Sequence, residues 1–190
     1  MPDDATPLVI YLQPALTPAE QADQCAALLA ELAAAGVVAP GHEASWLPVL
    51  QQAVAEPLPD SASGMALLIS GGFAPTYLWI TAAQPAGSPT RLGDAVLDTQ
   101  FPGDPAPAPD ATLAEGDVLH RVRSGWVPLG DGESAFVQTS VAAVTRTVPG
   151  VGDVDVCVWF NSIEPDAPEE LRDAVAGIAR SDELIAYLSS

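Results

Sequence analysis

The sequence predicts an α+β protein with a mainly antiparallel sheet and helices packed on it. Short runs rich in β-branched and aromatic residues follow one another through the second half of the chain with brief turns between them, which is typical of a β-meander. Two segments, 17–35 and 166–180, show apolar residues at helical spacing behind capping residues. Since 48% of the 190 residues are apolar, the chain can bury a sizeable core, and we expect one domain over residues 1–190.

Residues 7–12, PLVIYL, are expected to form the first strand because they are short, β-branched and aromatic. The helix over 17–35 follows. Thr17 is its expected N-cap, Glu20 completes a capping box, and Gly36 ends the helix.

The next part of the chain is expected to hold a second helix and further strands. The helix spans 45–55, with Ser45 as its cap and Pro48 tolerated because it falls in the first turn. Strands are expected over 64–72 and 75–83, paired as a hairpin, and over 94–101.

Residues 102–117 are rich in proline, alanine and acid, and we interpret them as an exposed loop rather than a domain boundary. The strands of the meander are then expected over 117–129, 133–148 and 153–162, with turns at 130–132 and 148–153. Asp166 is expected to cap the helix that runs to residue 180, and Ser181 to cap a last short helix.

The stretch VPGVGDVDV, residues 148–156, raises the question of a phosphate-binding loop because it contains Gly-x-Gly. A dinucleotide fingerprint needs a third glycine and a helix after the loop. Here the following residues alternate with the period of a strand, and Asp153 and Asp155 would repel a phosphate. The stretch is therefore predicted to be a hairpin turn, in which Pro149 fixes one φ angle and a glycine supplies a positive one.

No other pattern indicates a catalytic or metal site. Asp153 and Asp155 would point the same way from a strand and could hold Ca²⁺ or Mg²⁺ with a third acid, but no EF-hand spacing exists. His42 and His120 stand alone, and there is no Gly-x-Ser-x-Gly motif. We therefore predict no catalytic, cofactor-binding or metal-binding residue.

The cysteines, tryptophans and arginines are interpreted as structural. The two cysteines, Cys25 and Cys157, are expected to be buried and reduced. Core packing is expected for Trp79, Trp126 and Trp159, although a deep pocket with a carboxylate of raised pKa beside Trp79 or Trp126 would instead indicate an enzyme. Arg121, Arg123 and Arg146 are expected to pair with acids, a small anion site being the alternative.

The charge excludes polyanionic partners. The chain has 25 acidic residues, six arginines and no lysine, for a formal charge of −19. Such a charge repels nucleic acids and anionic lipids, so neither a nucleic acid nor a membrane is expected as partner. The acidic N-terminal segment is unlike a secretory signal, which favours a cytoplasmic protein. The charge permits a basic protein partner, or serves solubility alone.

The segment from Phe136 to Ala179 resembles the end of a group of uncharacterised actinobacterial proteins. The matching parts are Val148-Pro149-Gly150 at a turn, Phe160-Asn161-Ser162 at a strand end and Ala176-Gly177-Ile178-Ala179 in the closing helix. That group is similar to the PsbP-like α/β/α sandwich. The preceding segment, from Asp94 to Trp126, fits the same order, so the resemblance covers roughly the last hundred residues, and the first ninety by element order alone. It implies a non-catalytic binding or assembly module and brings no site residues.

The functional expectation is a non-catalytic acidic binding or adaptor protein. One version is a chaperone- or immunity-type partner of a basic protein, linked to secretion. The alternative is a small-molecule-binding protein or an enzyme whose site is built from scattered residues. A third interpretation, a nucleic-acid mimic, would need acids in rows on one face.

Overall fold

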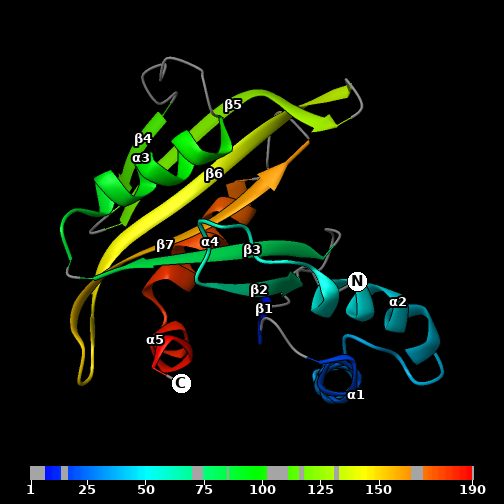
Figure 1. The fold of residues 1–190 in the computed structure, drawn as a ribbon. Helices are drawn as coiled ribbons and strands as arrows, with labels where there is room; N and C mark the ends of the chain where they lie inside the picture. Colours follow the sequence, from blue (N-terminus) through cyan, green and yellow to red (C-terminus); the bar gives the residue numbers. More distant parts are fainter. Residues whose placement is uncertain are drawn as a thin grey trace. The chain divides into compact units, whose positions relative to one another are not determined.

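The computed structural model describes residues 7–13, 17–69, 75–84, 86–101, 111–115, 118–130, 133–163 and 169–189. They confirm the α+β class, with an antiparallel sheet and helices packed on it (Figure 1). The chain divides into two compact units: unit 1 comprises Met1–Asp60 and Gly64–Tyr77, and unit 2 comprises Ser61–Ser63 and Leu78–Ser190. None of the helices described is long and apolar enough to cross a membrane.

Unit 1 holds two helices and an antiparallel strand pair. Strand β1 (Leu8–Leu12) pairs with β2 (Gly64–Ile69), and their register runs from Leu8 opposite Ile69 to Leu12 opposite Met65. Every residue of β2 is buried, as its unbroken apolar sequence requires. Helices α1 (Pro18–Ala34) and α2 (Glu43–Ala55) pack against each other, and their buried residues are Cys25, Leu28, Leu32, Leu50, Ala53 and Val54.

The predicted capping box of α1 is confirmed. The Glu20 backbone N–H donates to Thr17 Oγ1, and the Thr17 backbone N–H donates to Glu20 Oε2 at 2.8 Å. Gly36 follows the helix with a φ of 73°, a conformation that glycine adopts without strain.

The predicted start of α2 is wrong. The helix begins at Glu43, whose carboxylate accepts the Gly41 backbone N–H at 3.2 Å. The Ser45 hydroxyl donates to the His42 carbonyl, so it does not cap the helix. Pro48 consequently lies inside α2 rather than in its first turn, and its ring nitrogen removes one helical donor there.

The five further strands lie side by side, and each is antiparallel to its neighbours. Their order is β3 (Thr76–Ala83), β7 (Gly152–Ser162), β6 (Glu133–Val148), β5 (Val118–Gly130) and β4 (Ala111–Glu115). The predicted meander of β5, β6 and β7 is confirmed. Strand β4 corrects part of the loop predicted over 102–117, because its five residues pair with β5. Outside the described residues lie 102–110, residues 131–132 of the expected 130–132 turn, and residues 70–74, which hold the end of the strand predicted over 64–72 and the turn after it.

The strand predicted over 94–101 is wrong, because this segment belongs to helix α3 (Pro89–Gln100). Gly93, Val96 and Leu97 are buried at helical spacing. A Cβ added to Gly93 would meet Val141 Cγ1 at 3.3 Å, so the absence of a side chain lets α3 lie close against β6.

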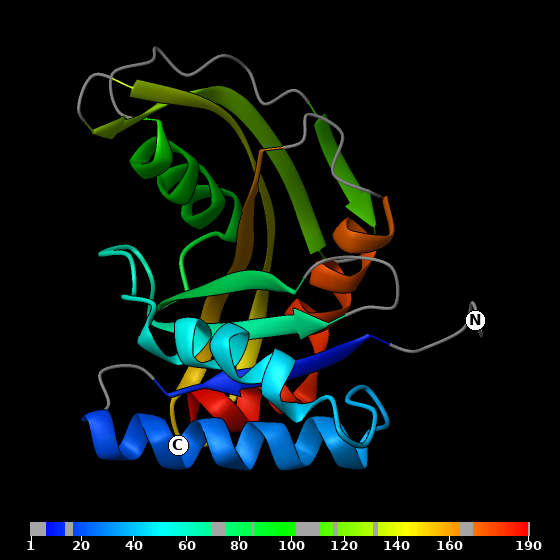
Figure 2. The same ribbon diagram turned by 90° about the vertical axis from the view of Figure 1, so that its right-hand side faces the viewer.

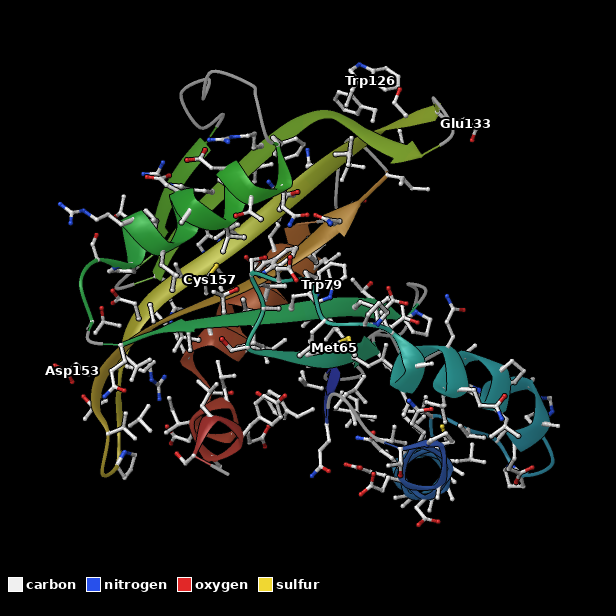
Figure 3. The ribbon with its side chains drawn as sticks, in the orientation of Figure 1. Met65, Trp79, Trp126, Glu133, Asp153 and Cys157 are labelled. Atoms are coloured by element: carbon white, nitrogen blue, oxygen red, sulfur yellow. The ribbon has the colours of Figure 1, made fainter. Side chains whose placement is uncertain are left out.

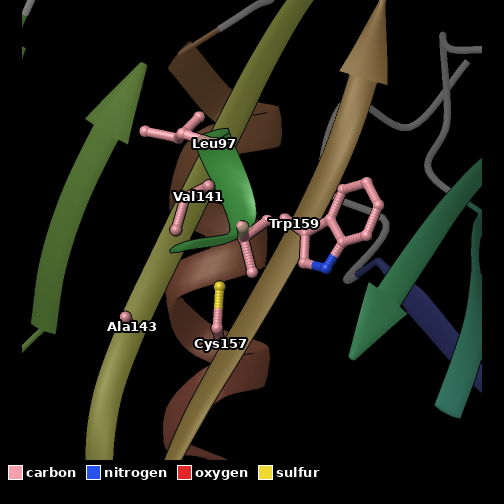
Figure 4. Close-up of a cluster of buried hydrophobic side chains, with 6 residues drawn as sticks. Leu97, Val141, Ala143, Cys157 and Trp159 are labelled. Carbon is pink, nitrogen blue, oxygen red and sulfur yellow. The ribbon is translucent and has the colours of Figure 1, made fainter. Parts of the chain in front are cut away.

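Helices cover both faces of the β5–β6–β7 sheet in unit 2 (Figures 1 and 2). Helix α3 packs on the face of Val141, Ala143, Cys157 and Trp159, which form a buried cluster with Val96 and Leu97 (Figure 4). Helices α4 (Glu169–Arg180) and α5 (Asp182–Leu188) lie on the other face. The Ser181 side chain accepts the Leu184 N–H and caps α5 as predicted, whereas Asp166 lies outside the described residues.

The predicted turn between β6 and β7 is confirmed. The Val151 N–H donates to the Val148 carbonyl at 3.0 Å, and Val148 pairs with Gly152. Pro149 and Gly150, which has a φ of 78°, occupy the central positions as a type II turn requires. A strand and not a helix follows the turn, so the geometry of a dinucleotide-binding loop is absent there.

Candidate functional site

The three strand arginines of unit 2 are bound to acids of its helices, as predicted. Arg121 and Arg123 project from β5 to Asp94 and Asp98, one turn apart on α3, at 2.7 and 2.8 Å. Arg123 is buried at 4% exposure and requires its carboxylate partner. These arginines therefore attach α3 to the sheet.

Arg146 attaches a helix to the other face of the sheet. Its guanidinium donates to Asp182 Oδ1 at 2.9 Å and to the backbone carbonyl of Arg180. It thereby links β6 to the end of α4 and the beginning of α5. Because its guanidinium donates to a carbonyl at the end of a helix, Arg146 has a structural role.

Asp153 and Asp155 form a hydrogen-bonded ladder with β6. Thr147 Oγ1 donates to Asp153 at 2.7 Å, and Thr145 Oγ1 donates to Asp155 at 2.6 Å. The second oxygen of Asp155 accepts the backbone N–H of Gly87 at 2.7 Å. The Asp155 carboxylate therefore holds the β3–α3 loop against β7. The described residues contain no group of three or more potential metal ligands.

The remaining candidates from the sequence lie on different elements. His42 is the N-cap residue of α2, and His120 lies on β5 opposite Ala142. The thiols of Cys25 and Cys157 are free and buried, and burial raises the pKa of both. Both therefore lack the depressed pKa of a reactive cysteine.

Two of the three strand tryptophans pack as predicted. Trp159 is fully buried, and Trp79 stacks on it with ring centroids 4.7 Å apart. The Trp159 indole N–H donates to Thr81 Oγ1 at 3.1 Å. The core prediction is wrong for Trp126, which is 68% exposed.

Trp126 is exposed because the β5–β6 hairpin extends past the end of β7. Strand β7 ends at Ser162, which lies opposite Gln138 of β6. Phe136 lies beyond that end and pairs with Trp126 across the hairpin. The sequence carries one partial signal of the overhang, because the strands predicted on either side of the 148–153 turn differ in length, but this difference does not show which side chains are left exposed.

The overhang carries an apolar surface, which we call the hairpin-end surface and define as Trp126 and Phe136. The Trp126 and Phe136 rings meet edge to face, with centroids 5.7 Å apart and planes at 73°. Phe136 is 39% exposed, and Ile163, the residue after β7, is 78% exposed. The described part of the chain has two other exposed large apolar side chains, Leu47 and Val151.

The described residues at this end of the hairpin carry an exposed carboxylate and no basic side chain. Glu133 begins β6 and is exposed at the same end of the hairpin as Trp126 (Figure 3). Residues 124–145 contain no arginine, lysine or histidine. The nearest arginine of β5, Arg123, is buried against Asp98.

A second feature of unit 2 is an apolar hollow beside the β6–β7 turn. It encloses about 240 Å³ and is lined by Ala82, Ala83, Gln84, Val148, Val151, Val154 and Leu188. Gln84 donates its side-chain amide to the Val151 carbonyl at 2.9 Å, which holds one wall in place.

Comparisons with protein-family models, with curated proteins and with solved structures find no match to this chain.

Proposed function

We propose that the protein is a non-catalytic acidic binding protein that docks a basic protein partner through the hairpin-end surface. The observation that supports this function is the cross-strand pair of exposed aromatic rings, Trp126 and Phe136. Burying such rings is favourable by about 25 cal/mol for each Å² removed from water. Tryptophan is also the residue type most enriched at the energetic centres of protein interfaces.

The charge selects among partners for this surface. A formal charge of −19 makes two copies of the chain repel each other, and it repels nucleic acids for the same reason. A basic protein would be attracted, and complementary charge accelerates its association. A chaperone- or immunity-type role toward a secreted basic protein is the form of this function that we propose.

The proposal extends to fold and compartment. Unit 2 has helices on both faces of an antiparallel sheet, and this layering supports the proposed PsbP-like α/β/α sandwich. PsbP-like domains serve mostly as binding or assembly modules, in agreement with docking. The two buried free thiols support a reducing compartment, and we propose the cytoplasm.

A small-molecule-binding protein is the second candidate, favoured by the apolar hollow. Its volume of about 240 Å³ lies below the roughly 300–1,000 Å³ of most ligand pockets. Its one polar lining side chain, Gln84, already donates to the Val151 carbonyl. We therefore favour the hairpin-end surface over the hollow as the binding site.

The test is affinity capture from host lysate with four baits. They are the wild type, Trp126→Ala, Phe136→Ala and the control Leu47→Ala, which truncates an exposed apolar residue elsewhere. We expect one protein to be captured in equal amount by the wild type and the control. The two aromatic variants should lose it, and the wild type should lose it at high salt, because the charge attraction is screened.

Two outcomes would overturn the proposal. One is a partner captured equally by all four baits, which would place the binding surface elsewhere. The other is no partner for any bait together with a ligand that raises the melting temperature of the wild type but not of Val151→Trp, a variant that fills the hollow. That result would favour the small-molecule alternative.

A further inference from the structure

We infer that the hairpin-end surface recognises an arginine side chain of the partner, whose guanidinium stacks on the Trp126 indole. This inference rests on the proposed function and names the chemistry of the contact. Tryptophan is the best aromatic acceptor for a cation, because its ring face carries the negative part of its quadrupole. With 68% of Trp126 exposed, the indole is accessible to an incoming group.

The chain supplies no cation of its own to this ring from the hairpin. Residues 124–145 contain no basic side chain, and Arg123 is buried against Asp98. The inferred cation therefore belongs to the partner and not to the hairpin. Phe136 lies edge to face with Trp126, which gives the indole an aromatic support on the adjacent strand.

Charge favours a cationic group over an apolar anchor. Glu133 is exposed at the same end of the hairpin, and the chain as a whole has a formal charge of −19. A partner leucine or phenylalanine would gain nothing from this field, whereas a cation is attracted by it. Arginine suits the site better than lysine, because its planar and weakly hydrated guanidinium stacks on an aromatic face.

The experiment uses the purified full chain and a short Gly/Ser peptide with two arginines. The matched control peptide carries citrulline, which has the shape of arginine without its charge. Binding is followed by proton–nitrogen correlation NMR, in which the Trp126 indole signal is assigned by its absence from Trp126→Phe. We expect the arginine peptide to move this signal while the signal of buried Trp159 stays unchanged.

A variant series separates stacking on the ring from general attraction. Trp126→Leu keeps an apolar side chain but removes the ring, and should weaken arginine-peptide binding by roughly 3- to 30-fold. Trp126→Phe should retain part of the affinity, and Glu133→Gln should weaken binding less than Trp126→Leu. The control Leu47→Ala should bind like the wild type.

The inference is overturned if the citrulline peptide moves the Trp126 signal as much as the arginine peptide does. It is also overturned if Trp126→Leu binds the arginine peptide like the wild type, since general charge attraction would then explain the binding. Failure of the proposed function looks different: the captured partner would be indifferent to Trp126→Ala. A partner lost by Trp126→Ala but retained by Trp126→Leu would uphold docking and reject the arginine.

Discussion

The Glu20 carboxylate closes the capping box at the start of α1, and its hydrogen bonds with the Thr17 side chain and backbone lower its pKa from the usual 4.5. A lowered carboxyl pKa means that the unfolded chain binds the proton first as the pH falls. The stabilisation is therefore fully present above the unfolded value and is lost as the pH drops through the folded one.

We predict that Glu20→Gln lowers the free energy of unfolding near neutral pH, and that its difference from the wild type shrinks below about pH 4. Urea unfolding at the two pH values measures this. Glu31→Gln, an exposed change further along α1, serves as control and should show a smaller effect at both. An effect of Glu20→Gln that grows on acidification would contradict the assigned role of the carboxylate.

Single residues were predictable from the sequence where a local rule decides them. The capping box at Thr17 and Glu20 follows from spacing alone, and so does the turn at Pro149 and Gly150. The exposure of Trp126 does not, because it depends on where β7 ends relative to the neighbouring hairpin. The sequence showed that Trp126 lies in a predicted strand, but it did not show that its side chain is exposed to solvent.

At the level of elements, two helical glycines provide a matched test of packing. Gly93 in α3 faces Val141, whereas an added Cβ at Gly177 in α4 would meet nothing within 4 Å. We predict that Gly177→Ala raises the free energy of unfolding by about 0.5–1 kcal/mol, because alanine restricts the unfolded chain and favours a helix.

Gly93→Ala should not show this gain, because its Cβ presses on a buried valine of the sheet. Gly93→Leu should destabilise the protein by about 1–3 kcal/mol, the usual cost of overpacking a core. Chemical denaturation of the three variants checks the comparison. If Gly93→Leu were as stable as the wild type, α3 would not lie as close to β6 as described.

The structure confirms the predicted elements whose sequences follow one dominant secondary-structure pattern. Strand β6 is one long run rich in valine, threonine and small residues between two turn signals, and its predicted bounds agree with the observed Glu133–Val148. The segment 94–101 was mistaken for a strand because Gly93 and two aspartates interrupt its helical stripe. Those aspartates pair with Arg121 and Arg123 of β5, so their place in α3 is explained by contacts with the sheet and not by the local sequence. Strand β4 was missed because the pairing that defines it comes from β5.

For the molecule as a whole, net charge is the dominant electrostatic property. The chain has 25 acidic residues and six arginines, so most carboxylates have no arginine partner available. Mutual repulsion of the remaining carboxylates favours the expanded, unfolded chain. Salt screens that repulsion and also weakens the exposed pair of Arg146 and Asp182, but repulsion is the larger effect.

We predict that the melting temperature rises as sodium chloride increases from about 20 mM to about 300 mM. Each kcal/mol gained would appear as about 2–4 °C for a chain of this size. Differential scanning calorimetry measures the shift, and caesium chloride is the control for specific sodium binding. A melting temperature that fell with salt would mean that the ion pairs outweigh the repulsion.

The stack of Trp79 on Trp159 gives unit 2 an optical property of its own. Two indoles with centroids 4.7 Å apart couple their electronic transitions, and the coupled pair absorbs circularly polarised light as a split band that a single ring does not give. Both rings belong to unit 2, whereas Trp46 belongs to unit 1. The split band thus follows the melting of unit 2 in an unlabelled protein, while the helical signal follows both units together.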